Sequence, residues 1–402
     1  MKSTHRFSLA VLPFLFGAAL LIGANSAGVA PAGLTVHEWG TFTSVAGVDG
    51  SAVEWNALGC QSDLPHFVND FGFRDLKWRL QGTVRMETPV LYFYSPREVE
   101  ARVKVSFPHG MITEWFPTAE YRVFQQDRPG EPAHAVPANL EGIVTSLRRV
   151  TGGIEWNGIQ VQPGTAPALP VENGPGRYYA ARGTDAAPLT VGGQHEKFLF
   201  YRGVGAFQPP LAARVSADDS VMVENRGRGS VPTVILFENR GGRIGFRNAG
   251  AVERAASLKP PALDGSLAQL RQELEAALIA QGLFPKEARA MVETWRDSWF
   301  EEGSRLIYVL PTAAVDGFLP LEVEPAPERI NRVFVGRIEL ITPETVSRLQ
   351  SAIARSDWAA VQPYRRFLDP MVSRAYPGDS ARVSQIERLY REFESQHGRS
   401  CN

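Results

Sequence analysis

Three glutamates in this sequence of 402 residues have neighbours that suit acid–base chemistry. Glu302 ends the acidic stretch TWRDSWFEE, and Glu38 and Glu196 lie in the aromatic stretches VHEWGTFT and HEKFLFYRG. Burial beside aromatic rings raises the pKa of a carboxyl group, and a raised pKa suits a general acid. We therefore take Glu302, Glu38 and Glu196 as candidate catalytic residues.

A helical wheel predicts which carboxylates of the acidic stretch are buried. If residues 285–303 form one helix, Glu302 lies on its apolar stripe, whereas Asp297 and Glu301 lie away from it. Glu302 is then expected to be mostly buried and the other two more exposed. Two interpretations stay open. Glu302 acts as an acid, or it pairs with Arg305 and locks the helix to the next strand; the second is favoured because ion pairs also perturb pKa values.

Tryptophan and arginine residues near these carboxylates are candidate binding residues. Glu-Trp occurs four times, and a tryptophan ring beside a carboxylate suits the face and the hydroxyl groups of a sugar. The candidates are Trp39, Trp115, Arg202 and Arg305. The alternative is structural, since tryptophan in a strand is typical of a core. Carboxylates in aromatic strands also tend to be buried beside arginine, and here Arg202 or Arg337 is the expected partner.

Histidine and cysteine residues allow two further kinds of site. His37, His109 and His195 together would suit Zn²⁺, although neither His-Glu pair has the second histidine four residues on that a metalloprotease helix needs. We expect no cofactor, with zinc at these histidines as the alternative. Cys60 and Cys401 either form a disulfide in an oxidising compartment or remain free, and the sequence does not decide between these states.

Composition and missing motifs exclude several classes of protein. The net charge of −1 gives no electrostatic case for binding nucleic acid. The sequence has no Gly-x-Ser-x-Gly motif, P-loop, dinucleotide fingerprint, calcium loop or haem-attachment motif. A cell-envelope component or a polysaccharide is the expected partner, and the oligomeric state is not specified.

The N-terminus predicts export. Lys2 and Arg6 precede an apolar run from Phe7 to Gly23, and small residues follow it, which is the order of a signal peptide. We assign residues 1–27 to the signal peptide and expect a periplasmic or extracellular protein. No later stretch is apolar enough to span a membrane, so we expect no membrane span after the signal peptide is cleaved.

Hydrophobic periodicity predicts a mainly β protein with helical additions. From about residue 34 to 250, short strands rich in β-branched and aromatic residues are bounded by glycine, proline and asparagine. Leucines at helical spacing follow, and a second helical stripe ends near residue 303. The predicted fold is an antiparallel β-sandwich-like domain over 34–342, with an inserted helical hairpin at 264–303 and a helical C-terminal extension at 343–402.

Five stretches resemble blocks that recur in a family of exported bacterial proteins with no assigned function. They are VHEWGTFTS, METPVLYFY, GMITEWFP, EKFLFYRG and TWRDSWFEEGSRLIYVLP. The resemblance spans residues 36–343 and implies that these blocks belong to one folding unit. It implies no activity and no catalytic residue.

Two functions follow from these observations. The favoured one is an extracytoplasmic binding or structural protein of the bacterial cell envelope. The alternative is a secreted hydrolase that acts on polysaccharide or peptide through carboxylates or a bound metal. Convergence separates them: a hydrolase requires the candidate carboxylates and histidines to line one cleft, whereas a structural role places each carboxylate under aromatic rings beside an arginine.

Overall fold

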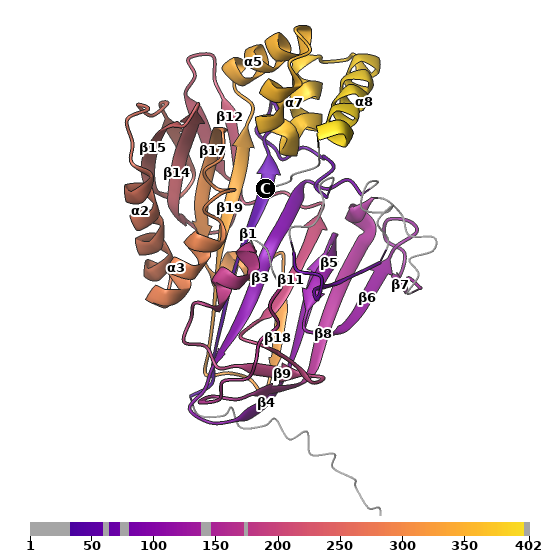
Figure 1. The fold of residues 1–402 in the computed structure, drawn as a ribbon, viewed down its shortest axis with the longest axis vertical. Coiled ribbons are helices and arrows are strands. Elements are labelled where there is room, and N and C mark those ends of the chain that lie inside the picture. The colour runs from indigo at the N-terminus through magenta and orange to yellow at the C-terminus, as the bar shows by residue number, and fades with distance from the viewer. Residues whose placement is uncertain (1–32, 59–63, 73–79, 138–145, 173–175, 398–402) are drawn as a thin grey trace, which may run out of the picture.

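The computed structural model describes residues 33–58, 64–72, 80–137, 146–172 and 176–397 (Figure 1). The predicted signal peptide and both members of the predicted disulfide, Cys60 and Cys401, lie outside the described residues. Within the described part of the chain, no helix is long and apolar enough to cross a membrane.

A large mixed sheet dominates the molecule, so the mainly β prediction is confirmed (Figure 1). Its strands run in the order β10-β9-β8-β5-β11-β3-β1-β19-β17-β14-β15. Their bounds are β1 (Thr35–Val45), β3 (Val84–Tyr94), β5 (Gly110–Phe116), β8 (Val150–Val161), β9 (Leu189–Val191), β10 (Gln194–Glu196), β11 (Leu199–Gly205), β14 (Val231–Arg240), β15 (Arg243–Val252), β17 (Gly303–Leu310) and β19 (Arg329–Leu340). The predicted antiparallel pairing holds for most neighbours but fails at the centre, where β1 and β19 are parallel along their length.

Shorter strands extend this sheet and form a second one. The strands β2 (Asn69–Asp70), β4 (Val99–Pro108), β6 (Glu120–Gln125), β7 (His134–Ala135) and β18 (Leu321–Glu324) pair beside the main path. A separate three-stranded sheet contains β12 (Leu211–Val215), β13 (Val221–Asn225) and β16 (Ala255–Leu258). Apolar and polar residues alternate over residues 101–107, and in β4 the apolar ones are buried and the polar ones are partly exposed.

The central strands bury both of their faces. In β3, Leu91 and Phe93 belong to one hydrophobic cluster, whereas Val90 and Tyr92 belong to another on the opposite face, because successive side chains of a strand alternate. Ten of the eleven residues of β1 are buried. Two covered faces explain why the central strands read as continuous apolar and aromatic runs.

Two helices pack with the second of these clusters. The helices α2 (Leu267–Ala280) and α3 (Pro285–Thr294) lie between β16 and β17, where the sequence predicts a helical pair. However, α3 ends at Thr294, and residues 295–302 form consecutive turns and bends. The helical wheel therefore does not apply to the acidic end of the stretch.

The C-terminal segment is helical. It contains α5 (Pro343–Ala354), α6 (Trp358–Val361), η3 (Gln362–Phe367), α7 (Leu368–Ala375) and α8 (Ser380–His397). Its helices α5, α7 and α8 lie together at one end of the molecule (Figure 1). Thr342 caps α5, because its hydroxyl accepts a hydrogen bond from the N–H of Thr345. Three other short helices are η1 (Leu147–Arg149), η2 (Arg177–Arg182) and α4 (Thr312–Asp316).

Candidate functional site

The guanidinium of Arg305 holds the turns that follow α3. Arg305 is fully buried in β17. Its two terminal nitrogens donate to the carbonyl oxygens of Trp299, Glu301 and Glu302 at 3.1, 2.7 and 2.6 Å. Its Nε donates to the carboxylate of Glu339 at 3.0 Å. These carbonyl oxygens lie beyond the end of α3, so the arginine supplies the hydrogen bonds that a continued helix would have given them.

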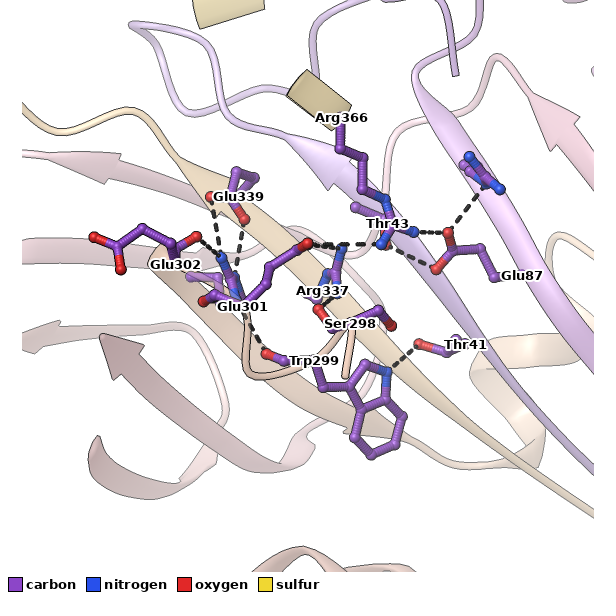
Figure 2. A network of polar contacts seen from close by, with 12 residues as sticks. Thr41, Thr43, Glu87, Ser298, Trp299, Glu301, Glu302, Arg337, Glu339 and Arg366 are labelled. Atoms are coloured by element: carbon purple, nitrogen blue, oxygen red, sulfur yellow. Dashed lines mark hydrogen bonds and ion pairs between the residues drawn. The ribbon is translucent and has the colours of Figure 1, made fainter. Parts of the chain in front are cut away.

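Two further arginines contact the same turns, and one of them belongs to the C-terminal segment (Figure 2). Arg337 on β19 donates to the carbonyl of Ser298 and to Glu301 Oε1, the latter at 3.2 Å. Arg366 on η3 pairs with Glu301 at 3.6 Å and also contacts Glu87. Burial lowers the pKa of Arg337 to about 10, and the nearby Arg305 acts in the same direction, whereas Glu301 opposes it. Arg337 therefore stays cationic near neutral pH.

We call this set the turn network. Its members are Arg305, Arg337, Arg366, Glu87, Glu301 and Glu339. Every carboxylate in it has at least one arginine partner.

Glu302 is mostly buried, as predicted, although it lies beyond the end of α3. The side chains of Glu302 and Glu301 are both 20% exposed, so the expectation that Glu301 is the more exposed of the two is wrong. Asp297 is exposed as predicted, at 53%. The carboxylate of Glu302 accepts the N–H of Gly241 at 2.8 Å and lies 3.9 Å from Arg348. Its predicted ion pair with Arg305 is absent, because Arg305 contacts the backbone carbonyl of Glu302 instead.

Glu38 is enclosed within the central part of the large sheet. It is fully buried in β1, accepts a hydrogen bond from Tyr201 at 2.6 Å and pairs with Arg332 at 2.6 Å. The parallel register of β1 and β19 places Glu38 directly opposite Arg332. Pairing with an arginine is thus present, but neither Arg202 nor Arg337, the expected partners, supplies it.

Glu196 is sealed in the same way at a different place. It is fully buried at the end of β10, and Arg182 of η2 reaches both of its oxygens. Tyr178 donates a further hydrogen bond at 3.1 Å, and the backbone N–H of Lys197 donates one at 2.8 Å. This carboxylate has an arginine partner of its own, as Glu38 does.

His37 belongs to a buried chain of polar groups that the sequence reasoning did not identify. Its Nδ1 lies 2.8 Å from Glu287 Oε2, and the hydroxyl of Tyr94 donates to Glu287 Oε1 at 2.8 Å. Glu287 also caps the start of α3, since it accepts the N–H of Phe284 at 2.7 Å. A glutamate two residues after Pro285 is a typical helix-start signal and could have pointed to Glu287.

The other candidate metal ligands lie on other elements. His109 is an exposed residue at the turn between β4 and β5, and its Nδ1 lies 2.7 Å from the carbonyl oxygen of Arg148. His195 in β10 lies 2.9 Å from the hydroxyl of Thr190. Within the described ranges, no three histidine, cysteine, aspartate or glutamate residues form a group that could hold a metal ion, so His37, His109 and His195 do not converge.

The candidate binding residues are all buried. Trp39 is fully buried against Tyr92, with their ring centroids 5.9 Å apart. Trp115 is 7% exposed and stacks on Tyr121 at 4.9 Å. Arg202 is 3% exposed, and Arg305 is fully enclosed by the turn network. These four side chains therefore stabilise the core in this structure and do not present a surface to a ligand.

A cleft of about 540 Å³ lies beside Tyr94 and Lys197, and we call it the Lys197 cleft. Four chain segments build it: Gly33, which lies two residues before β1, the end of β3, the loop after β8, and the loops around β9 and β10. The lining residues are Gly33, Tyr94, Ser95, Pro96, Pro163, Gly164, Thr165, Thr184, Asp185, Ala186, Ala187, Pro188 and Lys197. Three prolines fix the backbone of the walls.

The ionisable groups of this cleft are suited to binding. The Nζ of Lys197 donates to the carbonyl oxygen of Thr184 at 2.7 Å. Partial burial lowers the pKa of Lys197, and the nearby Lys286 also lowers it, whereas Asp185 raises it. Burial and the adjacent Glu287 carboxylate raise the pKa of Tyr94, which therefore remains a neutral hydroxyl.

Comparison with known proteins adds little to this description. No protein-family model and no curated protein matches the chain. Among solved structures, one match is the Fcho1 Mu homology domain of Danio rerio with a bound Eps15 peptide, at 7% sequence identity and a TM-score of 0.30. The alignment covers 78% of this chain and 98% of that chain. A TM-score this low does not define a shared fold.

Proposed function

We propose that this protein is an extracytoplasmic binding or structural protein of the bacterial cell envelope. The observation that carries the proposal is the separation of the three candidate catalytic carboxylates. Glu38 is paired with Arg332, Glu196 with Arg182, and Glu302 accepts a backbone N–H from Gly241. A glycosidase needs two carboxyl groups that flank one bond, and a buried carboxylate held by arginine is a poor proton donor.

The location outside the cytoplasm rests on the sequence. The basic, apolar and small-residue order of the first 28 residues is that of a signal peptide. The sandwich-like character of the sheet domain remains part of the proposal, and the two buried faces of the central strands support it.

A co-sedimentation experiment tests the proposal. Purified mature protein is incubated with insoluble cell-envelope polysaccharide, the pellet is assayed for protein, and the supernatant is assayed for released reducing ends and free amino groups. We expect the protein in the pellet and no release above a buffer control. Release by the wild type that is lost in Glu302→Gln would favour the hydrolase and overturn the proposal.

Export is checked on the same preparation. N-terminal sequencing of the periplasmic fraction should give a mature chain that begins between Gly28 and Leu34. Recovery of the intact chain in the cytoplasm or the inner membrane would contradict an extracytoplasmic role.

A further inference from the structure

The ammonium group of Lys197 forms no ion pair with Asp185, the one carboxylate among the lining residues of the cleft. None of the ion pairs among the described residues includes Lys197, and its one side-chain hydrogen bond goes to a neutral carbonyl. Asp185 is engaged by Lys286 at 2.5 Å, and Glu196 by Arg182 at 2.7 Å. With Asp185 engaged by Lys286, the ammonium of Lys197 keeps N–H donors for an anionic ligand group.

The geometry leaves donors for such a group. An ammonium has three N–H donors, and the bond to Thr184 uses one of them. Lys197 lies in the two-residue connection between β10 and β11, and its neighbours Glu196 and Phe198 are fully buried. The base of its side chain is therefore fixed, and a fixed cation loses less conformational entropy when it binds.

The remaining lining suits a sugar ring rather than a flat or fully apolar ligand. Pro96, Pro163 and Pro188 offer C–H surfaces. The hydroxyls of Ser95 and Thr165 donate to backbone carbonyls of the protein, so their oxygens can accept hydrogen bonds from the hydroxyls of a sugar. The Tyr94 hydroxyl is held by Glu287, so its oxygen stays available as an acceptor. A volume of about 540 Å³ lies within the usual range for a small-molecule site and is ample for one or two sugar units.

We propose that the Lys197 cleft binds a uronic acid unit, with the sugar carboxylate on Lys197 and the sugar hydroxyls on Ser95 and Thr165. This inference rests on the proposed function, because it names the ligand class of an envelope-binding protein. The ligand can be a free uronic acid or the end of an acidic polysaccharide chain, since both present the same carboxylate.

Isothermal titration calorimetry with sodium D-glucuronate tests the assignment. The comparison ligands are D-glucose, which lacks the carboxylate, and N-acetyl-Ala-Ala, which carries a carboxylate without a sugar. Lys197→Gln is the test variant, and Lys259→Gln is the control because it removes the same unit charge from an exposed residue outside the cleft. Thermal melts confirm that both variants are folded.

We expect glucuronate to bind the wild type and both comparison ligands to bind more weakly. A charge-assisted hydrogen bond predicts a loss of about tenfold to a hundredfold in Lys197→Gln, and less than about threefold in Lys259→Gln. Equal binding of glucose and glucuronate, preferential binding of N-acetyl-Ala-Ala, or equal losses in the two variants would overturn the proposal. A titration with an acidic oligosaccharide distinguishes a chain end from a free sugar.

Failure of this inference differs from failure of the proposed function. If glucuronate does not bind but the protein still sediments with envelope polysaccharide, the cleft assignment is wrong and the proposed function stands. If neither occurs, both are wrong.

Discussion

Replacing Arg305 with lysine tests whether this residue acts through its charge or through the shape of its guanidinium. The wild-type side chain serves three carbonyl oxygens and one carboxylate. A lysine keeps the charge, but its three N–H donors all belong to one nitrogen. They cannot reproduce the planar, forked arrangement of donors in a guanidinium. We therefore expect Arg305→Lys to unfold more easily even though the ion pair with Glu339 is retained in principle.

The magnitude follows from the acceptors that lose a donor. Each buried acceptor left unpaired costs about 1–3 kcal/mol, and about two of the four acceptors are expected to lose their partner. The expected loss for Arg305→Lys is therefore about 2–6 kcal/mol. Removing one partner of a buried ion pair costs about 3–5 kcal/mol, and Glu339→Gln keeps an acceptor oxygen, so the lower end is expected there.

Glu302→Gln is the control from the same turns. Its side chain is 20% exposed, and the amide oxygen can still accept the N–H of Gly241. The expected loss is about 1 kcal/mol or less.

Denaturant unfolding of the four proteins gives the comparison, with equal m-values as the check that the unfolded states are comparable. If Arg305→Lys is nearly as stable as the wild type while Glu339→Gln is not, the ion pair dominates and the carbonyl argument is refuted. If Glu302→Gln is the least stable variant, the described role of the turns is wrong.

Three further changes test other parts of the structure. Glu196→Gln should lower the free energy of unfolding by an amount toward the lower end of about 3–5 kcal/mol, because Arg182 loses a buried charged partner. An unchanged melting temperature would contradict this. In Gly336→Ala the new Cβ would lie 2.1 Å from the ring of Tyr308, so a loss of stability of about 1–3 kcal/mol is expected in thermal melts. Unchanged stability would show that the ring can move. Burial raises the pKa of Asp369, so the folded state holds its proton to a higher pH and wild-type stability falls as pH rises through that range. Asp369→Asn should therefore be more stable than wild type at neutral pH and similar to it below the ordinary value of 3.8; a difference that grows on acidification would refute the sign.

Local patterns in the sequence predict the elements well where neighbours along the chain determine them. Leu270, Leu274 and Leu278 recur at helical spacing, and all three are buried on α2. The alternation in residues 101–107 likewise predicts β4. Both features depend on side chains only a few residues apart, which a periodicity can detect.

Pairings between distant segments cannot be predicted in this way. Glu38 and Arg332 are 294 residues apart, and only the parallel register of β1 with β19 brings them together. The sequence around Lys197 does not predict a binding site either, since a lysine in the connection between two strands is common. Its importance comes from the engagement of Asp185 and Glu196 by other cations, which is a property of the folded chain.

The predicted helix over residues 295–303 is wrong, and this error shows how a tertiary contact overrides a helical pattern. The apolar spacing of Met291, Trp295 and Trp299 continues past Thr294, and all three residues are buried although the helix has ended. Arg305 reaches back from β17 to the carbonyls that the helix has released, so the turns satisfy their backbone without helical bonds. Burial of the aromatic residues thus preserves the apolar pattern while the backbone changes. Arg305 and Glu301 of this stretch are explained by that change, because Arg305 binds the released carbonyls and Glu301 pairs with Arg337 and Arg366. Asp297 stays exposed.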